Sequence, residues 1–224
     1  SVLKNIKLDL DGLVDEIIVV DDCSIDDTLK KAKDEDVIVI EHKKNTGYGG
    51  ALKTGIKNSK GKYILMMDSD GQHSTKDVKN IILKLDDQDA IIGARESVFH
   101  SQLWRMPGKW FLHLFAQYLI GRKIKDLNSG LRIVKSDLLK QWMDLCPQGF
   151  SFSTTITMVL LSQNYTVDYV PINVNKRTGK STVSIKTGLD TIILILRLSS
   201  LFNPLRIFLP ISLIFILVGS VKII

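Results

Sequence analysis

Four short apolar runs, rich in β-branched residues, alternate with segments of helical pattern along the first part of the chain. The runs cover residues 16–21, 37–41, 62–67 and 89–93. Apolar runs of this length are typical of strands buried on both faces, and their alternation with helices predicts an α/β fold with a mostly parallel sheet between helices. Ligands of such sheets bind beyond the carboxyl ends of the strands. We therefore expect the functional residues directly after these runs.

Two carboxylates follow the third run. Asp68 and Asp70 are two positions apart, so in an extended backbone both side chains point to the same side. Paired carboxylates at a strand end suit a hard divalent cation such as Mg²⁺, which keeps further positions for water and phosphate oxygens. Gln72 lies close enough along the chain to complete the site. The sequence predicts a divalent-cation site at these three residues, with a solvated acidic turn as the alternative.

Two more acids, Asp21 and Asp22, end the first run. A carboxylate at this position can accept hydrogen bonds from a nucleotide base or from ribose hydroxyls. Capping of the next helix is the alternative, and it suffices for the polar residues that follow, Ser24, Asp26 and Thr28. For Asp21 and Asp22 we expect nucleotide contacts.

The segment from Asn45 to Gly50 is a cluster of turn residues ahead of a helical pattern. It is similar to a phosphate cradle, but it lacks the Lys-Ser/Thr pair of a P-loop and the spacing of a dinucleotide-binding loop. A tight turn between a strand and a helix explains the cluster equally well.

The last part of the chain is almost wholly apolar over about the 20 residues that a bilayer span requires. We expect an α/β domain over residues 1–184, an amphipathic helix over residues 185–203 in the plane of a membrane interface, and a transmembrane helix over residues 204–224. A buried core helix is the alternative to the span.

The formal net charge is +6. This basic balance suits nucleic acid, an anionic membrane surface or phosphate-bearing substrates. The sequence has no basic stripe interleaved with aromatic residues, which argues against nucleic acid. Cys23 and Cys146 form neither a CxxC pair nor a metal-binding spacing, and they are typical of reduced thiols on the cytoplasmic side. We expect phosphate-bearing partners and a location on the cytoplasmic face of a membrane.

Five motifs occur in order along nearly the whole chain: Val19-Val-Asp-Asp-x-Ser-x-Asp-x-Thr28, Asn45-x-Gly-x-Gly-Gly-Ala51, Met67-Asp-Ser-Asp-Gly-Gln-His73, Gly93-Ala-Arg95 and Asn128-Ser-Gly-Leu-Arg132. Together they resemble the family 2 glycosyltransferases of GT-A fold, in the branch of the dolichyl-phosphate mannose synthases and bactoprenyl glucosyltransferases.

The resemblance implies an inverting transfer of a sugar from GDP-mannose or a UDP-hexose to a polyprenyl phosphate, with Mg²⁺ or Mn²⁺ as cofactor. Relatives in this branch can also associate through their membrane parts. By motif position, the resemblance implies donor contacts at Asp21, Asp22, Asp68, Ser69, Arg95 and Arg105. It implies catalytic and acceptor-side residues at Asp70, Asp126 and Arg132. It implies a basic loop that closes over the phosphates at Arg177, Lys180 and Ser181.

Two departures from the family accompany these motifs. The family usually opens with a strand carrying Pro-x-Tyr/Phe-Asn-Glu, and no such strand precedes Ser1, so we expect a chain trimmed at its start and also at its apolar end. Leu131 stands where the family usually has an aromatic residue.

Three other functions remain alternatives. A processive polysaccharide synthase usually carries Gln-x-x-Arg-Trp after the acceptor motif, whereas residues 102–105 precede Asp126 and are followed by Met106. A nucleotidyltransferase would open with a Gly-rich basic loop and lack the apolar C-terminus. A non-catalytic membrane scaffold would have no need of the Asp68 and Asp70 pair.

Overall fold

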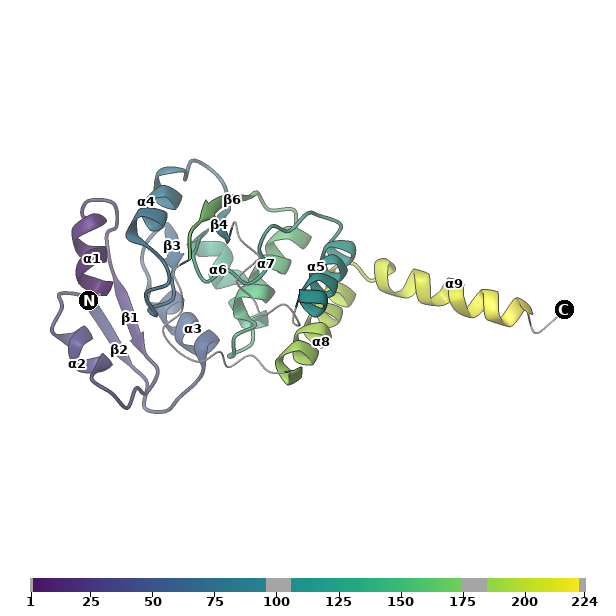
Figure 1. Cartoon of the computed structure of the whole chain (residues 1–224), viewed down its shortest axis with the longest axis horizontal. Helices are drawn as coiled ribbons and strands as arrows, with labels where there is room; N and C mark the ends of the chain where they lie inside the picture. Colours follow the sequence, from purple (N-terminus) through teal and green to yellow (C-terminus); the bar gives the residue numbers. More distant parts are fainter. Residues whose placement is uncertain (1, 96–105, 175–184, 222–224) are drawn as a thin grey trace.

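The computed structural model describes residues 2–95, 106–174 and 185–221. Its elements, in chain order, are α1 (Val2–Asp9), β1 (Ile18–Asp21), α2 (Thr28–Lys33), β2 (Ile38–Glu41), α3 (Tyr48–Asn58), β3 (Tyr63–Met66), α4 (Thr75–Leu83), β4 (Ala90–Arg95), α5 (Met106–Ile120), β5 (Arg132–Lys135), α6 (Ser136–Trp142), the 3-10 helix η3 (Met143–Leu145), α7 (Phe152–Ser162), β6 (Val167–Ile172), α8 (Ile185–Phe202) and α9 (Leu205–Val221). The alternation of strands and helices confirms the α/β prediction (Figure 1).

The strands form two sheets. β1 and β2 pair in parallel, and the other sheet has the order β3-β5-β4-β6. β4 and β6 are parallel, whereas β5 is antiparallel to both of its neighbours. The sheet is therefore mixed rather than mostly parallel. The reason is the segment that precedes β5, which returns to the carboxyl end of β4, where Gly93 N donates to Leu131 O. A strand that starts there must run backwards.

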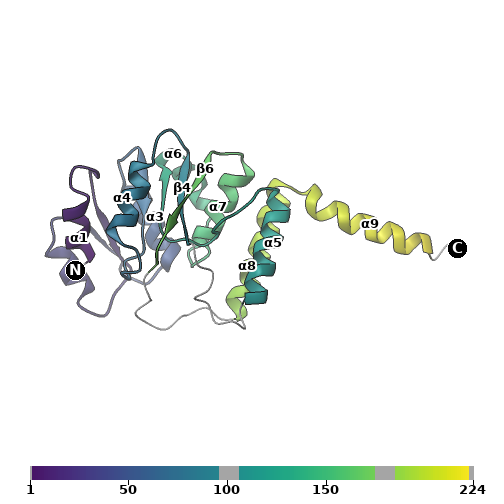
Figure 2. The same cartoon turned by 45° about the horizontal axis from the view of Figure 1, so that its top comes forward.

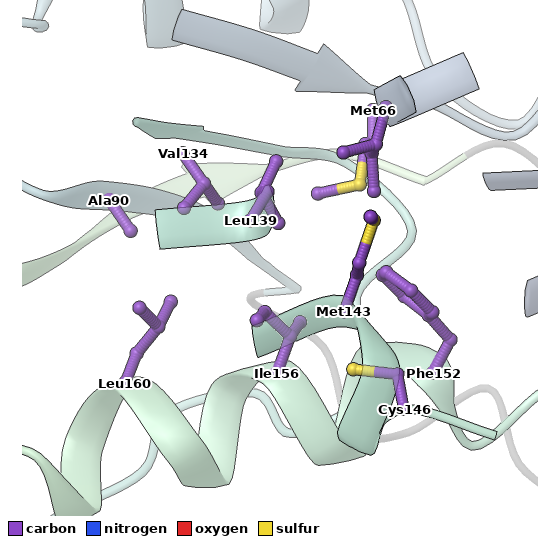
Figure 3. Packing of buried hydrophobic residues seen from close by; sticks show 10 residues of the cluster. Met66, Ala90, Val134, Leu139, Met143, Cys146, Phe152, Ile156 and Leu160 are labelled. Atoms are coloured by element: carbon purple, nitrogen blue, oxygen red, sulfur yellow. The ribbon is translucent and has the colours of Figure 1, made fainter. Parts of the chain in front are cut away.

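Both faces of the larger sheet are covered by helices. Side chains from α3, α6 and α7 pack on one face (Figure 3), and this cluster contains Ile56, Met66, Ala90, Val134, Leu139, Met143, Cys146, Phe152, Ile156 and Leu160. On the other face, Val78 and Ile81 of α4 pack against Ile91 and Ile133. Neighbouring strand residues such as Ile133 and Val134 point to opposite faces, as the pleat of a strand requires. The core thus fixes the carboxyl ends of β3 and β4, where the acids lie.

A third layer lies beyond α7. Helices α5 and α8 run side by side and pack on α7 through Ala116, Leu119, Met158, Ile195 and Leu198 (Figure 2). One side of α5 thus packs in the core, while Leu114 and Tyr118 on its other side are exposed.

Helix α9 extends away from the rest of the chain (Figures 1 and 2). Among the described residues, no single helix has both the length and the apolar character of a membrane crossing. The segments 190–202 and 205–220 together meet those two criteria, with a bend of 97° between them. The expected span over residues 204–224 and the strand expected before Ser1 stay predictions.

Candidate functional site

Polar side chains gather around the carboxyl ends of β1, β3 and β4 and the loop ahead of β5. Asp21 ends β1, Asp68 follows β3, Arg95 ends β4, and Asp126 lies in the returning loop. The charges of Asp68 and Asp126 both act on the guanidinium of Arg95. The structure therefore brings three of the predicted site residues, Asp68, Arg95 and Asp126, into one region.

Asp68 lies in the most constrained position of the region. Its Oδ1 is buried and has no hydrogen-bond partner within the described part of the chain. Gly130 lies against the same carboxylate so closely that a Cβ at this position would overlap it. An unpartnered carboxylate oxygen in the interior is costly, so this atom is expected to have a ligand when the protein acts. Asp70 Oδ1 accepts from Gln72 N at 3.1 Å, and Ser69 between the two acids is exposed.

Asp22 fastens the turn at the start of α3. Its carboxylate accepts from Thr46 N at 2.8 Å, Thr46 Oγ1 at 2.8 Å and Gly47 N at 2.7 Å, and it contacts His42 Nδ1 at 2.7 Å. Burial alone would raise the pKa of Asp22, but these hydrogen bonds outweigh it and lower the pKa to about 2. The partners of this carboxylate thus lie within the protein. The contact with a nucleotide that the sequence predicted for Asp22 stays a prediction.

Asp21 is almost fully buried, with 4% exposure. Its Oδ2 accepts from Ser24 N at 3.1 Å, a contact within the turn after β1 and not a cap of α2, whose N-cap residue is Asp27 without a side-chain cap. Its Oδ1 has no hydrogen-bond partner in the described ranges. One oxygen of Asp21 therefore holds the turn after β1, and the other is left for a ligand.

Arg95 and Asp126 form a forked ion pair. Arg95 Nε donates to Asp126 Oδ2 at 2.7 Å, and Nη2 donates to Oδ1 at 2.9 Å. Burial would raise the pKa of Asp126, but the guanidinium of Arg95 more than offsets this and the pKa lies below its ordinary value. The same hydrogen bonds raise the pKa of Arg95. Both side chains are therefore charged, and two hydrogen bonds join them to each other.

Arg132 lies in the interior of the protein, and the acceptor-side role implied by the motif stays a prediction. Its side chain is 1% exposed. The guanidinium donates to Ser129 O, to Ser153 O at 2.9 Å and to Thr157 Oγ1 at 2.9 Å. Burial lowers its pKa, while the nearby charges of Asp126 and Asp68 act to raise it. Arg132 thus supplies buried positive charge close to Asp68.

The remaining expected site residues, Arg105, Arg177, Lys180 and Ser181, lie outside the described residues. Their assignment to donor phosphates and to a basic loop stays a prediction.

Comparison with known proteins identifies the family. Residues 1–142 match the family described as glycosyl transferase family 2. This chain belongs to that family. The motifs from β1 to Arg132 all lie inside the matched region, so the resemblance drawn from the sequence is confirmed.

Named relatives of this family 2 chain act on dolichyl phosphate. A dolichyl-phosphate beta-glucosyltransferase of Dictyostelium discoideum is 30% identical over 70% of this chain and 54% of its own length. A UDP-N-acetylglucosamine--dolichyl-phosphate N-acetylglucosaminyltransferase of Methanococcus voltae is 30% identical over 56% of this chain and 61% of its own length. The chain thus spans somewhat more than half of these relatives.

The fold is that of solved glycosyltransferases. Glucosyl-3-phosphoglycerate synthase of Mycobacterium tuberculosis, in complex with Mn²⁺, UDP and glucosyl-3-phosphoglycerate, superposes with a TM-score of 0.71. The match covers 89% of this chain and 74% of that one at 19% identity, so it shows the fold alone.

The acids of this family 2 chain suit a divalent cation that takes some of its ligands from the protein and the others from a substrate. Within residues 2–95, 106–174 and 185–221, no three His, Cys, Asp or Glu side chains are grouped so that they could hold a metal by themselves. Mg²⁺ is usually held by one or two carboxylates together with substrate phosphates. The unpartnered Oδ1 of Asp68 and the neighbouring Asp70 are compatible with that description, and the cation site predicted at Asp68, Asp70 and Gln72 stays a prediction.

His73 borders this pair of acids. Its Nδ1 is buried without a hydrogen-bond partner in the described structure, and burial lowers the pKa of the imidazole. A cavity of about 280 Å³ adjoins it, between α1 and the loop after β3. Its lining comes from Val2, Asn5 and Ile6 of α1 and from residues 71 and 73–75, and it includes neither of the two carboxylates.

Tyr48 is a site residue that the motifs did not single out. It opens α3 and lies beside Asp68 and Ser153, and its ring stacks on Phe150 with 5.7 Å between centroids. Burial and then the charge of Asp68 raise the pKa of Tyr48 to about 12, so the phenol keeps its proton. The only signal in the sequence is its place within the turn cluster from Asn45 to Gly50.

Proposed function

We propose that this chain transfers a sugar from a nucleoside-diphosphate donor to a polyprenyl phosphate at a membrane surface. The observation that carries the proposal is the unpartnered, buried oxygen of Asp68 next to Asp70, at the carboxyl end of β3 in a family 2 chain. The dolichyl-phosphate activities of the named relatives support the choice of acceptor.

The pairing of Asp126 with Arg95 suits an acceptor that needs no general base. A sugar hydroxyl must lose a proton to attack, whereas a phosphate monoester is already an anion near neutral pH. Asp126 is ionised, but both of its oxygens accept hydrogen bonds from Arg95. An acceptor that arrives deprotonated places no demand on this carboxylate.

The reaction that fits these residues is a direct displacement. A phosphate oxygen of the acceptor forms the bond to the anomeric carbon, the bond from that carbon to the donor's diphosphate oxygen breaks, and the configuration inverts. Asp68 and Asp70 would hold Mg²⁺ or Mn²⁺, which when bound neutralises charge on the departing diphosphate. Tyr48 lies against Asp68, Gly130 leaves room for its carboxylate, and the Arg95–Asp126 pair fixes the loop ahead of β5 against the end of β4.

The third layer of helices suits attachment to a membrane. The exposed sides of α5 and α8 carry apolar side chains, Leu114, Tyr118, Ile193, Leu196 and Leu201. The bend of 97° between α8 and α9 allows the first helix to lie in the interface while the second enters the bilayer. We place the domain on the cytoplasmic face, in keeping with its basic charge and its two free cysteines. Association of copies through the membrane region is a further expectation.

The donor sugar is best identified by direct assay. The two named relatives differ in the sugar that their names give, glucose in one and N-acetylglucosamine in the other. The chain would be purified in detergent and incubated with polyprenyl phosphate, Mn²⁺ or Mg²⁺, and radiolabelled nucleotide sugars in turn. Transfer is measured as label that passes into the organic phase.

Two variants frame this assay. Asp70→Ala removes a proposed cation ligand and should abolish transfer, while Asp86→Ala removes an exposed acid after α4 and should leave transfer intact. If folded protein transfers no sugar to the lipid but does extend a glycan, the polyprenyl-phosphate acceptor is wrong and the alternative of a glycan acceptor stands.

A further inference from the structure

A turn built from cations follows α5. Gly121 adopts a φ of +78° and its N–H donates to Gln117 O at 2.7 Å. The side chain of the same glutamine accepts from Ile124 N at 3.1 Å, and Ile124 is buried. These contacts fix the backbone of the turn around one buried anchor. Three cations, Arg122, Lys123 and Lys125, are exposed on its outside.

This cationic turn, defined as residues 121–125, is joined to the start of α9. Arg206 Nη1 donates to Tyr118 O at the carboxyl end of α5, and Tyr118 Oη donates back to Arg206 O at 3.3 Å. The Arg206 guanidinium lies where a Cβ at Gly121 would be, and the φ of +78° at this position favours glycine. A cation at the carboxyl end of a helix is also favoured by the helix dipole. The turn and the base of α9 therefore form one unit.

Helix α9 leaves the body at this corner and exposes apolar side chains on every side. Ten of them between Leu205 and Val218 are 46–74% exposed. Both views show the helix pointing away from the layer of α5 and α8 (Figure 2). A helix that is apolar on all sides requires an apolar environment. The sequence of this region suits the hydrocarbon core of a bilayer.

We propose that the cationic turn binds the anionic headgroups of the bilayer that receives α9. This inference rests on the membrane attachment proposed above and adds a requirement for lipid charge. If α9 enters the bilayer at Leu205, the turn lies at the level of the headgroups, because Arg206 and Gly121 are in contact. The next acid in sequence, Asp126, is buried and paired with Arg95, so it does not neutralise the turn. The three cations complement a layer of negative charge.

Of the three cations, Lys125 is the most constrained. Its Nζ lies 5.8 Å from the centre of the Tyr169 ring, whereas Arg122 and Lys123 are exposed on the outside of the turn. A cation close to an anionic membrane surface strengthens binding about fivefold, so three together contribute on the order of a hundredfold. A nucleic acid would also complement the positive charge of the turn, but nucleic-acid binding would not explain the apolar helix α9 beside it.

The test compares two triple variants of the full chain. Arg122→Gln/Lys123→Gln/Lys125→Gln removes the charges of the cationic turn. Lys30→Gln/Lys31→Gln/Lys33→Gln removes an equal charge from three neighbouring exposed lysines of α2, at the opposite end of the molecule (Figure 1). Each protein is diluted from detergent into a mixture of phosphatidylcholine vesicles and vesicles that contain phosphatidylglycerol, and the two populations are separated by density.

The wild type and the α2 variant should prefer the anionic vesicles, and this preference should weaken at high salt. The turn variant should lose most of the preference, on the order of a hundredfold at low salt, with unchanged circular dichroism and unchanged sugar transfer in detergent. Equal preference in all three proteins would overturn the inference and leave the membrane attachment standing. If the wild type binds neither vesicle, the attachment itself is wrong, and if duplex DNA displaces it from vesicles through the turn, the partner is nucleic acid. Sugar transfer in detergent reports separately on the proposed reaction.

Discussion

Arg95 and Asp126 meet side chain to side chain through two hydrogen bonds, at 2.7 Å and 2.9 Å, although 31 positions separate them in the chain. The pair ties the end of β4 to the loop that leads into β5. β5 runs antiparallel to β4 because the chain has returned to the carboxyl end of that strand before β5 begins. The ion pair lies at this same end of β4.

Breaking this pair from one side should cost more than removing it altogether. Arg95→Gln leaves a carboxylate that is 8% exposed without its partner, and we expect a loss of about 2 kcal/mol in the free energy of unfolding. Adding Asp126→Asn should recover part of that loss, because the double variant has no unpaired buried charge. Urea unfolding of the two single variants and the double variant measures the coupling. Strictly additive losses would show that the pair is not coupled.

The hydrogen bonds to Asp22 predict that the free energy of unfolding decreases at acid pH. Because the pKa of Asp22 is lowered to about 2 in the folded protein, its contribution is fully present above the ordinary pKa of an aspartate, near 4, and is lost as the pH falls toward 2. Asp22→Asn should therefore remove about 1–2 kcal/mol at neutral pH and less in acid. Urea unfolding between pH 6 and pH 2.5 checks this, with Asp11→Asn as an exposed control. A constant difference between wild type and Asp22→Asn across this range would contradict the assignment.

Much of this architecture was accessible from sequence patterns. A strand that shows as an apolar run, and an acid that directly follows it, can be recognised from residues adjacent in the sequence. These local patterns predicted β1 to β4 and placed Asp68 and Asp70 at the end of a strand. The role of Asp22 was not accessible, because it depends on the amide of Thr46, 24 positions away. The burial of Arg132 likewise depends on Ser153 and Thr157 of α7, a helix whose packing no local pattern reveals.

Gly130 should be required for cation binding at Asp68. A methyl group there would overlap the carboxylate and displace it from its position beside Asp70. We expect Gly130→Ala to weaken the binding of Mn²⁺ in the presence of a nucleoside diphosphate by about tenfold or more, in line with the effect of disturbing the supports of metal ligands. Gly149→Ala is the matched control, since a Cβ at that position meets no atom within 4 Å. Calorimetric titration with Mn²⁺ measures both, and equal affinities would remove Gly130 from the cation site.

Arg132 should affect stability before it affects the reaction. Its guanidinium donates to two backbone carbonyls and to Thr157, a set of contacts that one ammonium group cannot reproduce. We expect Arg132→Lys to lower the free energy of unfolding by about 3 kcal/mol, because buried acceptors lose their partners while a charge stays in the interior. Thermal unfolding, followed together with the KM for the lipid acceptor, separates the two roles. A variant that unfolds like the wild type but has a raised KM would support the acceptor contact that the motif alone suggested.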